Sequence, residues 1–166
     1  MRALGLKGAV ITMSDSRSAS AGKADLSGET ACRLLQEAGY ELIHYELISD
    51  DLEGIKETLV RVCQLGPDLL LTTGGTGLSP RDNTPEATRA IIQKEVPGIS
   101  EAMRWNGLQI TPRAMLSRGI SGIRDTTLII NLPGSPKAVR ENLDYILDHL
   151  AHGLQILRQE ARECAK

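Results

Sequence analysis

Short apolar runs alternate along the chain with amphipathic stretches, which is the pattern of strands alternating with helices. Three runs predict strands, over Lys7–Met13, Glu41–Ile48 and Asp68–Thr73. Between them, apolar residues at helical spacing predict helices over Gly28–Ala38 and from Asp51 to the Gly66–Pro67 pair. Residues 68–73 read DLLLTT, which is typical of a strand buried on both faces. The polar stretch from Ser14 to Asp25 is expected to be an exposed loop.

The second half of the chain continues the alternation. A helix is expected to begin at Thr84–Pro85, with Thr84 as N-cap, and to run to about Lys94. The further predicted elements are a helical segment over residues 99–108 after a break at Pro97–Gly98, strands over 119–124 and 126–132 joined around Asp125, and a long helix from Ser135–Pro136 to Leu157. The predicted fold class is therefore α/β: a three-layer, mostly parallel twisted sheet with helices on both faces, in a single domain spanning residues 1–166.

Composition narrows the function. The 166 residues include one Trp, three Tyr, no Phe and sixteen Gly, with a net charge of −2. So few aromatic side chains and so little positive charge disfavour nucleic-acid binding. No apolar run approaches the ~18 residues of a membrane span, and the first thirteen residues do not match a signal peptide. Cys32, Cys63 and Cys164 are too widely spaced for a disulfide framework, which fits a reducing cytoplasm.

Polar or glycine-rich segments follow four of the predicted strands. They are Ser14–Asp15, Asp50–Asp51, Gly74–Asp82 and Asn131–Lys137. Ligands of open α/β sheets bind at the carboxyl ends of the strands, so we expect these segments to form a site. Gly74, Gly75 and Gly77 would let backbone N–H groups approach an anion such as phosphate, although an ordinary tight turn has the same composition. The run matches neither a Walker loop nor a dinucleotide-binding fingerprint.

Two carboxylates stand out beside this loop. Asp82 could hold Mg²⁺ against phosphate oxygens, with Asp50 from the neighbouring strand end as the second ligand. Asp82 could instead stabilise the turn, and either Asp50 or the adjacent Asp51 could be the site carboxylate, the other favouring a helix N-terminus. The Asn131–Lys137 turn carries a helix N-terminus and a lysine, which suits an anion, but it could equally be an ordinary connection capped by Ser135.

The run LLLTTGGTGLSPRDNTPEAT, Leu69 to Thr88, closely resembles the molybdopterin adenylyltransferase family, which includes MogA, MoaB and the G domains of gephyrin and its plant relatives. Three further segments are similar to that family: the Ser14–Asp15 loop up to Ser18, PGISEAMR at residues 97–104, and LSRG to NLPGSPKAV within residues 116–139. The resemblance covers the chain from about Gly8 to Leu157.

The resemblance implies the molybdenum-cofactor-biosynthesis fold and adenylylation of molybdopterin by Mg-ATP, with release of pyrophosphate. Asp50 and Asp82 match the two functionally critical aspartates and are expected to hold Mg²⁺. The expected substrate and nucleotide residues are Ser14, Asp15, Thr73, Gly74, Gly75, Thr76, Gly77, Ser117, Asn131, Pro133, Gly134, Ser135 and Lys137.

The same resemblance implies a homotrimer that binds small molecules, with docking to a molybdate-inserting enzyme as a further expectation. Composition, cysteine spacing and hydropathy, as given above, predict a cytoplasmic protein that binds neither nucleic acid nor membranes. Two alternatives stay open. One is a MoaB-type protein that binds molybdopterin without adenylylating it, and the other is a trimeric interaction scaffold like that of gephyrin.

Overall fold

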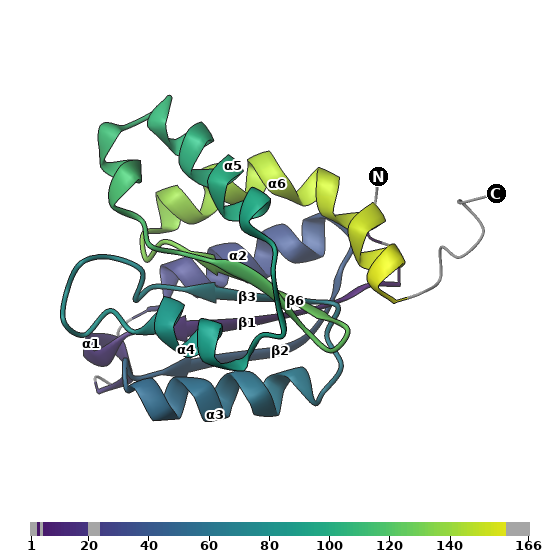
Figure 1. The fold of residues 1–166 in the computed structure, drawn as a ribbon, viewed down its shortest axis with the longest axis horizontal. Helices are drawn as coiled ribbons and strands as arrows, with labels where there is room; N and C mark the ends of the chain where they lie inside the picture. The colour runs from purple at the N-terminus through teal and green to yellow at the C-terminus, as the bar shows by residue number, and fades with distance from the viewer. Residues whose placement is uncertain (1–2, 4, 20–23, 159–166) are drawn as a thin grey trace.

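A six-stranded sheet lies between two layers of helices (Figure 1) in the computed structural model, which describes residues 3, 5–19 and 24–158. The strands are β1 (Lys7–Met13), β2 (Glu41–Ile48), β3 (Leu69–Thr73), β4 (Lys94–Glu95), β5 (Ser121–Arg124) and β6 (Thr127–Leu132). Their order is β2-β1-β3-β6-β5-β4. The first four in this order are parallel. At one edge, β5 pairs antiparallel with β6, and β4 pairs antiparallel with β5. This confirms the predicted α/β class with a mostly parallel sheet.

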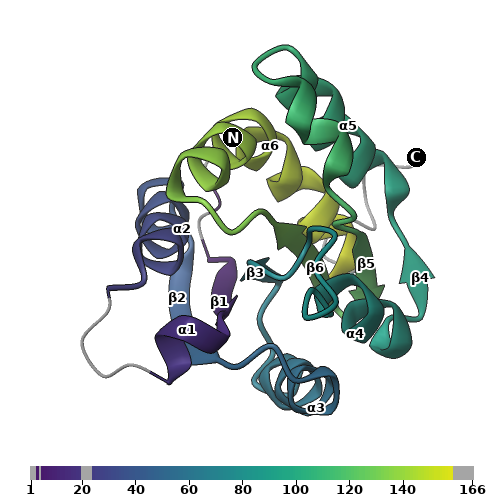
Figure 2. The ribbon, with the colours of Figure 1, turned by 90° about the vertical axis from the view of Figure 1, so that its left-hand side faces the viewer.

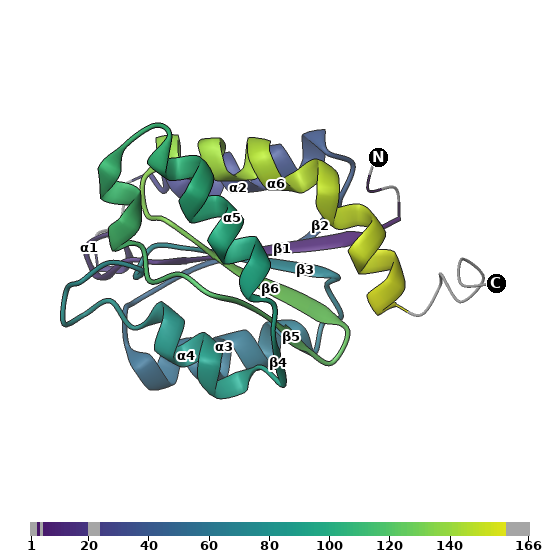
Figure 3. The ribbon, with the colours of Figure 1, turned by 45° about the horizontal axis from the view of Figure 1, so that its top comes forward.

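Helices cover both faces of the sheet (Figure 2). One layer holds α2 (Leu26–Glu37), α5 (Pro97–Leu108) and α6 (Pro136–Leu157), and the other holds α3 (Leu52–Cys63) and α4 (Thr84–Ile91). Figure 3 shows α5 crossing over β6 on its way to a short 3₁₀ turn, η1 (Pro112–Leu116). All five residues of β3 are buried because Leu69 and Leu71 face one helix layer and Leu70 faces the other.

The predicted exposed loop from Ser14 to Asp25 is wrong at both ends. Asp15–Ser18 form one helical turn, α1, capped by Ser14. Asp25 is only 4% exposed and is the N-cap of α2, where its carboxylate accepts a hydrogen bond from the N–H of Gly28. Residues 20–23 lie outside the described residues. The reason for the difference is tertiary, since neighbouring strands supply hydrogen-bond donors to Asp25 that no local pattern shows.

The helix that begins near Thr84 ends at Ile91, not near Lys94. Residues Lys94–Glu95 instead form β4, which pairs with β5, and the N–H of Gln93 donates to the carbonyl of Ile123 at 2.8 Å. A free sheet edge therefore overrides the local helical pattern. Pro97 does not break a helix but is the first residue of α5, where its missing N–H costs nothing.

Two of the three cysteines lie in the described part of the chain. Cys32 and Cys63 are free and partly buried, and burial raises the pKa of each thiol to about 11. Both therefore stay protonated at neutral pH, as expected of cysteines that fill space. Cys164 lies outside the described residues. No helix among the described residues is both long and apolar enough to cross a membrane.

Candidate active site

The carboxyl ends of β1, β2, β3 and β6 meet at one edge of the sheet, which faces the viewer in Figure 2. Backbone hydrogen bonds join the segments that follow these strands. The N–H of Ser14 donates to Ile48 at 2.9 Å, and the N–H of Gly74 donates to Leu132 at 3.2 Å. The four polar segments predicted from the sequence are thus brought to one edge.

The glycine loop after β3 has a backbone that only glycine fits. Gly74 and Gly75 have φ of +86° and +66°. A Cβ at Gly74 would lie 2.5 Å from the carbonyl oxygen of Met13, and one at Gly75 would lie 2.3 Å from the Thr84 hydroxyl. Thr84 donates this hydroxyl to the carbonyl of Gly74 at 2.9 Å. Asn83, not Thr84, is therefore the N-cap residue of α4, and Thr84 fastens the loop to the helix.

Asp50 and Asp51 have different surroundings. Asp51 caps α3, because its carboxylate accepts a hydrogen bond from the N–H of Gly54 at 2.7 Å. Asp50 exchanges two hydrogen bonds of 2.9 Å with Asp15, backbone N–H to carboxylate in each direction. Its Oδ1 is buried without a hydrogen-bond partner. Burial raises the pKa of the Asp50 carboxyl, and the charges of Asp15 and Asp82 raise it further against the opposing hydrogen bond from Asp15.

Asp50 and Asp82 approach the same glycine loop. A Cβ at Gly75 would lie 3.1 Å from Asp50 Oδ1, and a Cβ at Gly77 would lie 2.8 Å from Asp82 Oδ2. Asp82 Oδ2 also accepts a hydrogen bond from the N–H of Ser79 at 2.9 Å. Two carboxylates, one with an unpartnered buried oxygen, fit a hard cation such as Mg²⁺. No cluster of three or more His, Cys, Asp or Glu side chains that could hold a metal occurs among the described residues, so such a cation would need further ligands from phosphate or water.

An ion pair closes one side of this arrangement. Arg81 donates two hydrogen bonds, of 2.8 and 2.9 Å, to the carboxylate of Asp15. The Arg81 hydrogen bond holds the pKa of Asp15 below its ordinary value. The side chain of Asn83 donates to the carbonyl of Asp50 at 3.0 Å, so the loop after β3 is tied to the end of β2 as well. Sequence reasoning assigned no role to Arg81 or Asn83, since both partners lie far away in the chain.

A cavity of about 290 Å³ opens beside the glycine loop, between α5, η1 and the start of α6. Five of the predicted residues line it, namely Thr76, Gly77, Ser117, Asn131 and Pro133. The sequence did not predict that Arg104, Arg113 and Glu141 also line the cavity. Residues 97–104 are similar to the family, but no pattern of residue types within this segment predicts that it lies at the site.

Several predicted residues have local structural roles. The side chains of Ser14 and Ser135 cap α1 and α6, respectively. The side-chain amide of Asn131 lines the cavity, yet both its oxygen and its nitrogen are hydrogen-bonded within the protein. Lys137 is 81% exposed and lies 3.7 Å from the Glu141 carboxylate. A role for these four residues in binding stays a prediction.

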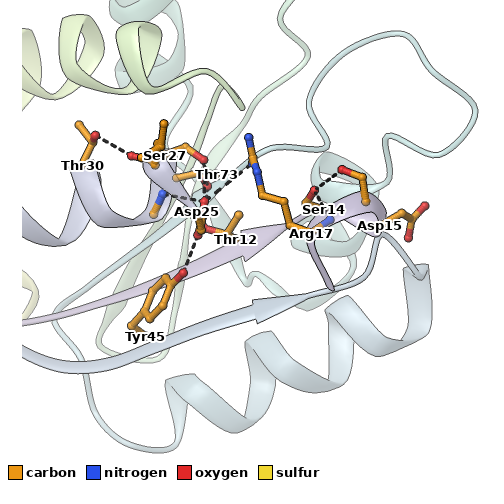
Figure 4. A network of polar contacts seen from close by, with 12 residues as sticks. Thr12, Ser14, Asp15, Arg17, Asp25, Ser27, Thr30, Tyr45 and Thr73 are labelled. Carbon is orange, nitrogen blue, oxygen red and sulfur yellow. Dashed lines mark hydrogen bonds and ion pairs between the residues drawn. The ribbon is translucent and has the colours of Figure 1, made fainter. Parts of the chain in front are cut away.

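Thr73 belongs to a buried polar network, not to the cavity lining (Figure 4). Its hydroxyl lies 2.9 Å from that of Thr12 and 3.5 Å from that of Ser27. Asp25 accepts hydrogen bonds from Ser27 at 3.0 Å and from the Tyr45 hydroxyl at 2.6 Å. Burial raises the pKa of Asp25, but hydrogen bonds from Thr12, Tyr45 and other donors lower it more, so that the pKa is below its ordinary value. The network joins α2 to the carboxyl ends of β1 and β3.

Comparison with known proteins identifies the family of this chain. Residues 9–152 match the family described as "Probable molybdopterin binding domain". The chain belongs to the molybdenum cofactor biosynthesis family. A molybdopterin adenylyltransferase from Helicobacter pylori (strain J99) is 42% identical over 138 residues, which cover 80% of this chain and 77% of that protein.

Another member of the family has a known structure. The structure of the molybdopterin biosynthesis enzyme MoaB from Thermus thermophilus is 44% identical, with a TM-score of 0.82 over 93% of this chain and 97% of that one. Gephyrin from Dictyostelium discoideum is 46% identical over 118 residues, but these cover 71% of this chain and only 16% of gephyrin. The chain therefore corresponds to a small part of that larger relative.

In this family member, Gly77 connects the Asp82 carboxylate to the cavity. Gly77 lines the cavity and also lies against the carboxylate of Asp82. Within the described part of the chain, the N–H groups of Gly75, Thr76 and Gly77 have no hydrogen-bond partner. Free amides and paired carboxylates beside a cavity can hold a phosphate group together with its cation.

Proposed function

We propose that this protein is a Mg²⁺-dependent molybdopterin adenylyltransferase, which uses ATP and molybdopterin as substrates. The observation that carries the proposal is that Asp50 and Asp82 both lie against the glycine loop with its free amides, and that Thr76 and Gly77 of this loop line the cavity. Molybdopterin would occupy the cavity, and the nucleotide phosphates would lie against the loop and the two carboxylates. The relative from Helicobacter pylori, named for this activity, supports the assignment.

The chemistry requires positioning more than covalent help. An oxygen of the terminal phosphate of molybdopterin attacks the α-phosphorus of ATP, a new P–O bond forms, and the bond from the α-phosphorus to the bridging oxygen of the β-phosphate breaks. Pyrophosphate leaves with that electron pair, and the attacking oxygen is already ionised, so no general base is needed. In-line alignment and neutralisation of charge are then the main requirements.

The residues present can meet these requirements. Asp50 and Asp82 would hold Mg²⁺, which when bound neutralises phosphate charge. The N–H groups of Gly75 and Gly77 would donate to phosphate oxygens, which keeps the reacting groups in place without side chains between them. Arg81 would remain paired with Asp15 and so keep the Asp15–Asp50 hydrogen bonds in register.

The cavity suits the pterin portion of molybdopterin. Glu141 is the one acidic residue among the described residues that line it. A carboxylate can accept two hydrogen bonds at once, and the pterin ring offers N3–H and the 2-amino group side by side as donors. We therefore assign Glu141 to the pterin edge and the arginines at positions 104 and 113 to its oxygen atoms or its phosphate.

A decisive experiment measures pyrophosphate release from purified protein with molybdopterin, ATP and Mg²⁺. Release together with adenylyl-molybdopterin is expected for the wild type, and Asp82→Asn is expected to abolish it. Asp125→Asn is the control, because Asp125 lies in the β5–β6 turn at φ of +52°, where Asn is readily accommodated. Normal release by Asp82→Asn would refute the proposed site.

The family description, a probable molybdopterin binding domain, favours a second candidate function, which is binding of molybdopterin without adenylylation. In that case molybdopterin binds the wild-type protein, but ATP and Mg²⁺ produce no pyrophosphate. Isothermal titration with each substrate, measured beside the release assay, distinguishes the two functions.

We further propose that the protein is a cytoplasmic homotrimer to which a molybdate-inserting enzyme docks. Exposed apolar side chains on and between α5 and η1, including Trp105, Ile110 and Met115, support self-association. Sedimentation equilibrium should then give the mass of three chains, and a monomer mass across the micromolar range would refute the trimer. Capture of the molybdate-inserting enzyme on immobilised protein tests the docking.

A further inference from the structure

Arg118 lies between the cavity and the loop that carries Asp82. Its chain neighbours Ser117 and Gly119 both line the cavity. The backbone N–H of Arg118 donates to the carbonyl of Thr76 at 2.9 Å, so this segment runs alongside the glycine loop. The Arg118 side chain, 35% exposed, extends toward the Asp82 loop.

The guanidinium of Arg118 joins both ends of that loop. Its Nε donates to the carbonyl of Gly77 at 2.7 Å, and its Nη2 donates to the carbonyl of Asp82 at 2.7 Å. A further nitrogen pairs with the carboxylate of Glu86 in α4. One planar group with donors in a fixed fork thus sets the separation of Gly77 and Asp82, which a lysine with a single ammonium could not do.

Little else holds the segment between these two anchors. Residues 78–81 are exposed. Two hydrogen bonds of 2.9 Å between Ser79 and Asp82, and one of 3.2 Å from the N–H of Arg81 to the Ser79 hydroxyl, close a local turn. These bonds keep the turn closed but do not place it relative to the sheet. Arg81 contacts Asp15 from the exposed side, at the surface. Asn83 and Thr84, which follow Asp82, bond to Asp50 and to the glycine loop. Arg118 is the side chain that bonds to both ends of the segment that carries the Asp82 carboxylate.

We propose that Arg118 is a positioning residue, which holds the Asp82 carboxylate beside the cavity in the orientation that Mg²⁺-nucleotide binding requires. The inference rests on the proposed function, because it assigns Asp82 to the cation. Arg118 does not itself touch the reacting atoms. It acts by fixing the backbone on both sides of the loop, from a segment whose neighbours form the cavity wall.

Three variants test the role of Arg118. Arg118→Met removes the fork and its charge, and Arg118→Lys keeps the charge but not both anchors. Arg124→Met is the matched control, because Arg124 donates to the carbonyl of Ile91 at 2.7 Å and so holds the other end of the same helix, α4. For each variant, calorimetry gives the affinity for ATP at a series of Mg²⁺ concentrations and the affinity for molybdopterin alone. Thermal unfolding and adenylyl transfer are measured in parallel.

A carboxylate displaced by about 1 Å can lower a rate on the order of 100-fold. Arg118→Met should therefore lower kcat by about 10- to 100-fold and raise the Mg²⁺ concentration for half-maximal ATP binding about 10-fold, with molybdopterin affinity within about two-fold of wild type. Arg118→Lys should recover part of kcat. Arg124→Met should lower the melting temperature while kcat and the Mg²⁺ dependence stay at wild-type values.

Equal Mg²⁺ dependence in wild type, Arg118→Met and Arg124→Met would overturn the inference, since Arg118 would then only stabilise the fold. If Arg118→Met does not fold, the same measurements on Arg118→Lys decide the matter. A shifted Mg²⁺ dependence in a protein that never releases pyrophosphate would uphold the role of Arg118 and refute adenylyl transfer. Absence of Mg²⁺-dependent ATP binding in the wild type would overturn both.

Discussion

Asp50 and Asp51 are adjacent in the chain, yet their replacement should have opposite consequences. Asp50→Asn keeps the shape of the side chain and an oxygen that can accept the hydrogen bond from the N–H of Asp15. It removes the negative charge from the buried, unpartnered oxygen at the glycine loop. Asp51→Ala leaves that charge in place and removes the 2.7 Å capping bond to Gly54.

The magnitudes follow from these contacts. A unit negative charge about 4 Å from a cation at an effective dielectric constant of about 20 contributes about 4 kcal/mol, or about 10³-fold in a rate. Because Asn retains a neutral oxygen, we expect Asp50→Asn to lower kcat/KM by about 10²- to 10³-fold. Loss of the Asp51 cap should cost about 1 kcal/mol of stability, which is about 2–4 °C in melting temperature for a chain of this size.

The difference in stability between wild type and Asp50→Asn should depend on pH. Burial and neighbouring acids raise the pKa of Asp50 above its ordinary value of 3.8, so the folded protein holds this proton more tightly than the unfolded chain does. The ionised carboxylate therefore lowers wild-type stability as the pH rises through and above that range. Asp50→Asn should be at least as stable as wild type at pH 7, and the difference should vanish at acidic pH, where Asp50 is protonated in both states.

Two assays on both variants test this reasoning. Pyrophosphate release at saturating and limiting Mg-ATP gives kcat and KM. Thermal unfolding from pH 8 down to about pH 3, below the ordinary pKa of the Asp50 carboxyl, gives stability. The expected result is a stable Asp50→Asn whose kcat/KM is lowered by about 10²- to 10³-fold. Asp51→Ala should be less stable, with activity within about two-fold of wild type. Full activity in Asp50→Asn, or loss of activity in Asp51→Ala without loss of stability, would refute the assignment of Asp50 to the site.

Three further predictions concern the loop, the buried network and the cavity. Gly75 has φ of +66° and lies close to neighbouring side chains, so Gly75→Ala should lower stability by about 1–3 kcal/mol and weaken ATP binding in calorimetry. Gly66 has φ of +74° in open space, so Gly66→Ala should lower stability only. Equal ATP affinity in both variants would contradict this prediction. Tyr45→Phe removes the 2.6 Å hydrogen bond to Asp25. The lowered pKa of Asp25 stabilises the folded protein above the pKa of the unfolded chain, and this stabilisation is lost as the pH falls. The midpoint of acid unfolding should therefore move to higher pH and the stability at pH 7 should fall by about 1–3 kcal/mol; an unchanged midpoint would show that the bond adds no stability. Glu141→Gln should weaken pterin binding about 10-fold in a fluorescence titration. It should also remove the preference for pterin over lumazine, which lacks the 2-amino group. A preference that survives would show that Glu141 does not bind the N3–H and 2-amino edge of the pterin.

Much of the framework could be predicted from local sequence. The run DLLLTT reads as a strand buried on both faces because leucines in consecutive positions must face both helix layers. The glycines after it predict a close approach of backbone, and Gly74 and Gly75 adopt the positive φ that such an approach requires. Asp82 follows a few residues after these glycines, at the approach to a helix N-terminus, and this position made it a candidate.

Other features could not be predicted because their partners are distant in the chain. Asp25 looks like a loop residue, but strands β1 and β2 bring it Thr12 and Tyr45. Lys94–Glu95 continues a helical pattern in the sequence, but in the structure it pairs with the free edge of β5 and forms a strand. Arg118 reads as one basic residue in a turn, and only packing shows that it joins both ends of the Asp82 loop.

The few aromatic side chains and many glycines of this chain disfavour a stacking platform and favour a site built from backbone and carboxylates. Local preferences for strand, helix and turn act over a few residues, so the sequence by itself determined the alternation of elements, the glycine loop and the candidates Asp50 and Asp82. Which of two adjacent aspartates faces the loop, and which helices enclose the cavity, depends on contacts between residues far apart in the chain, such as the 35 positions that separate Asp15 from Asp50. Only the tertiary structure decided those points, because burial and hydrogen bonding are properties of neighbours in space.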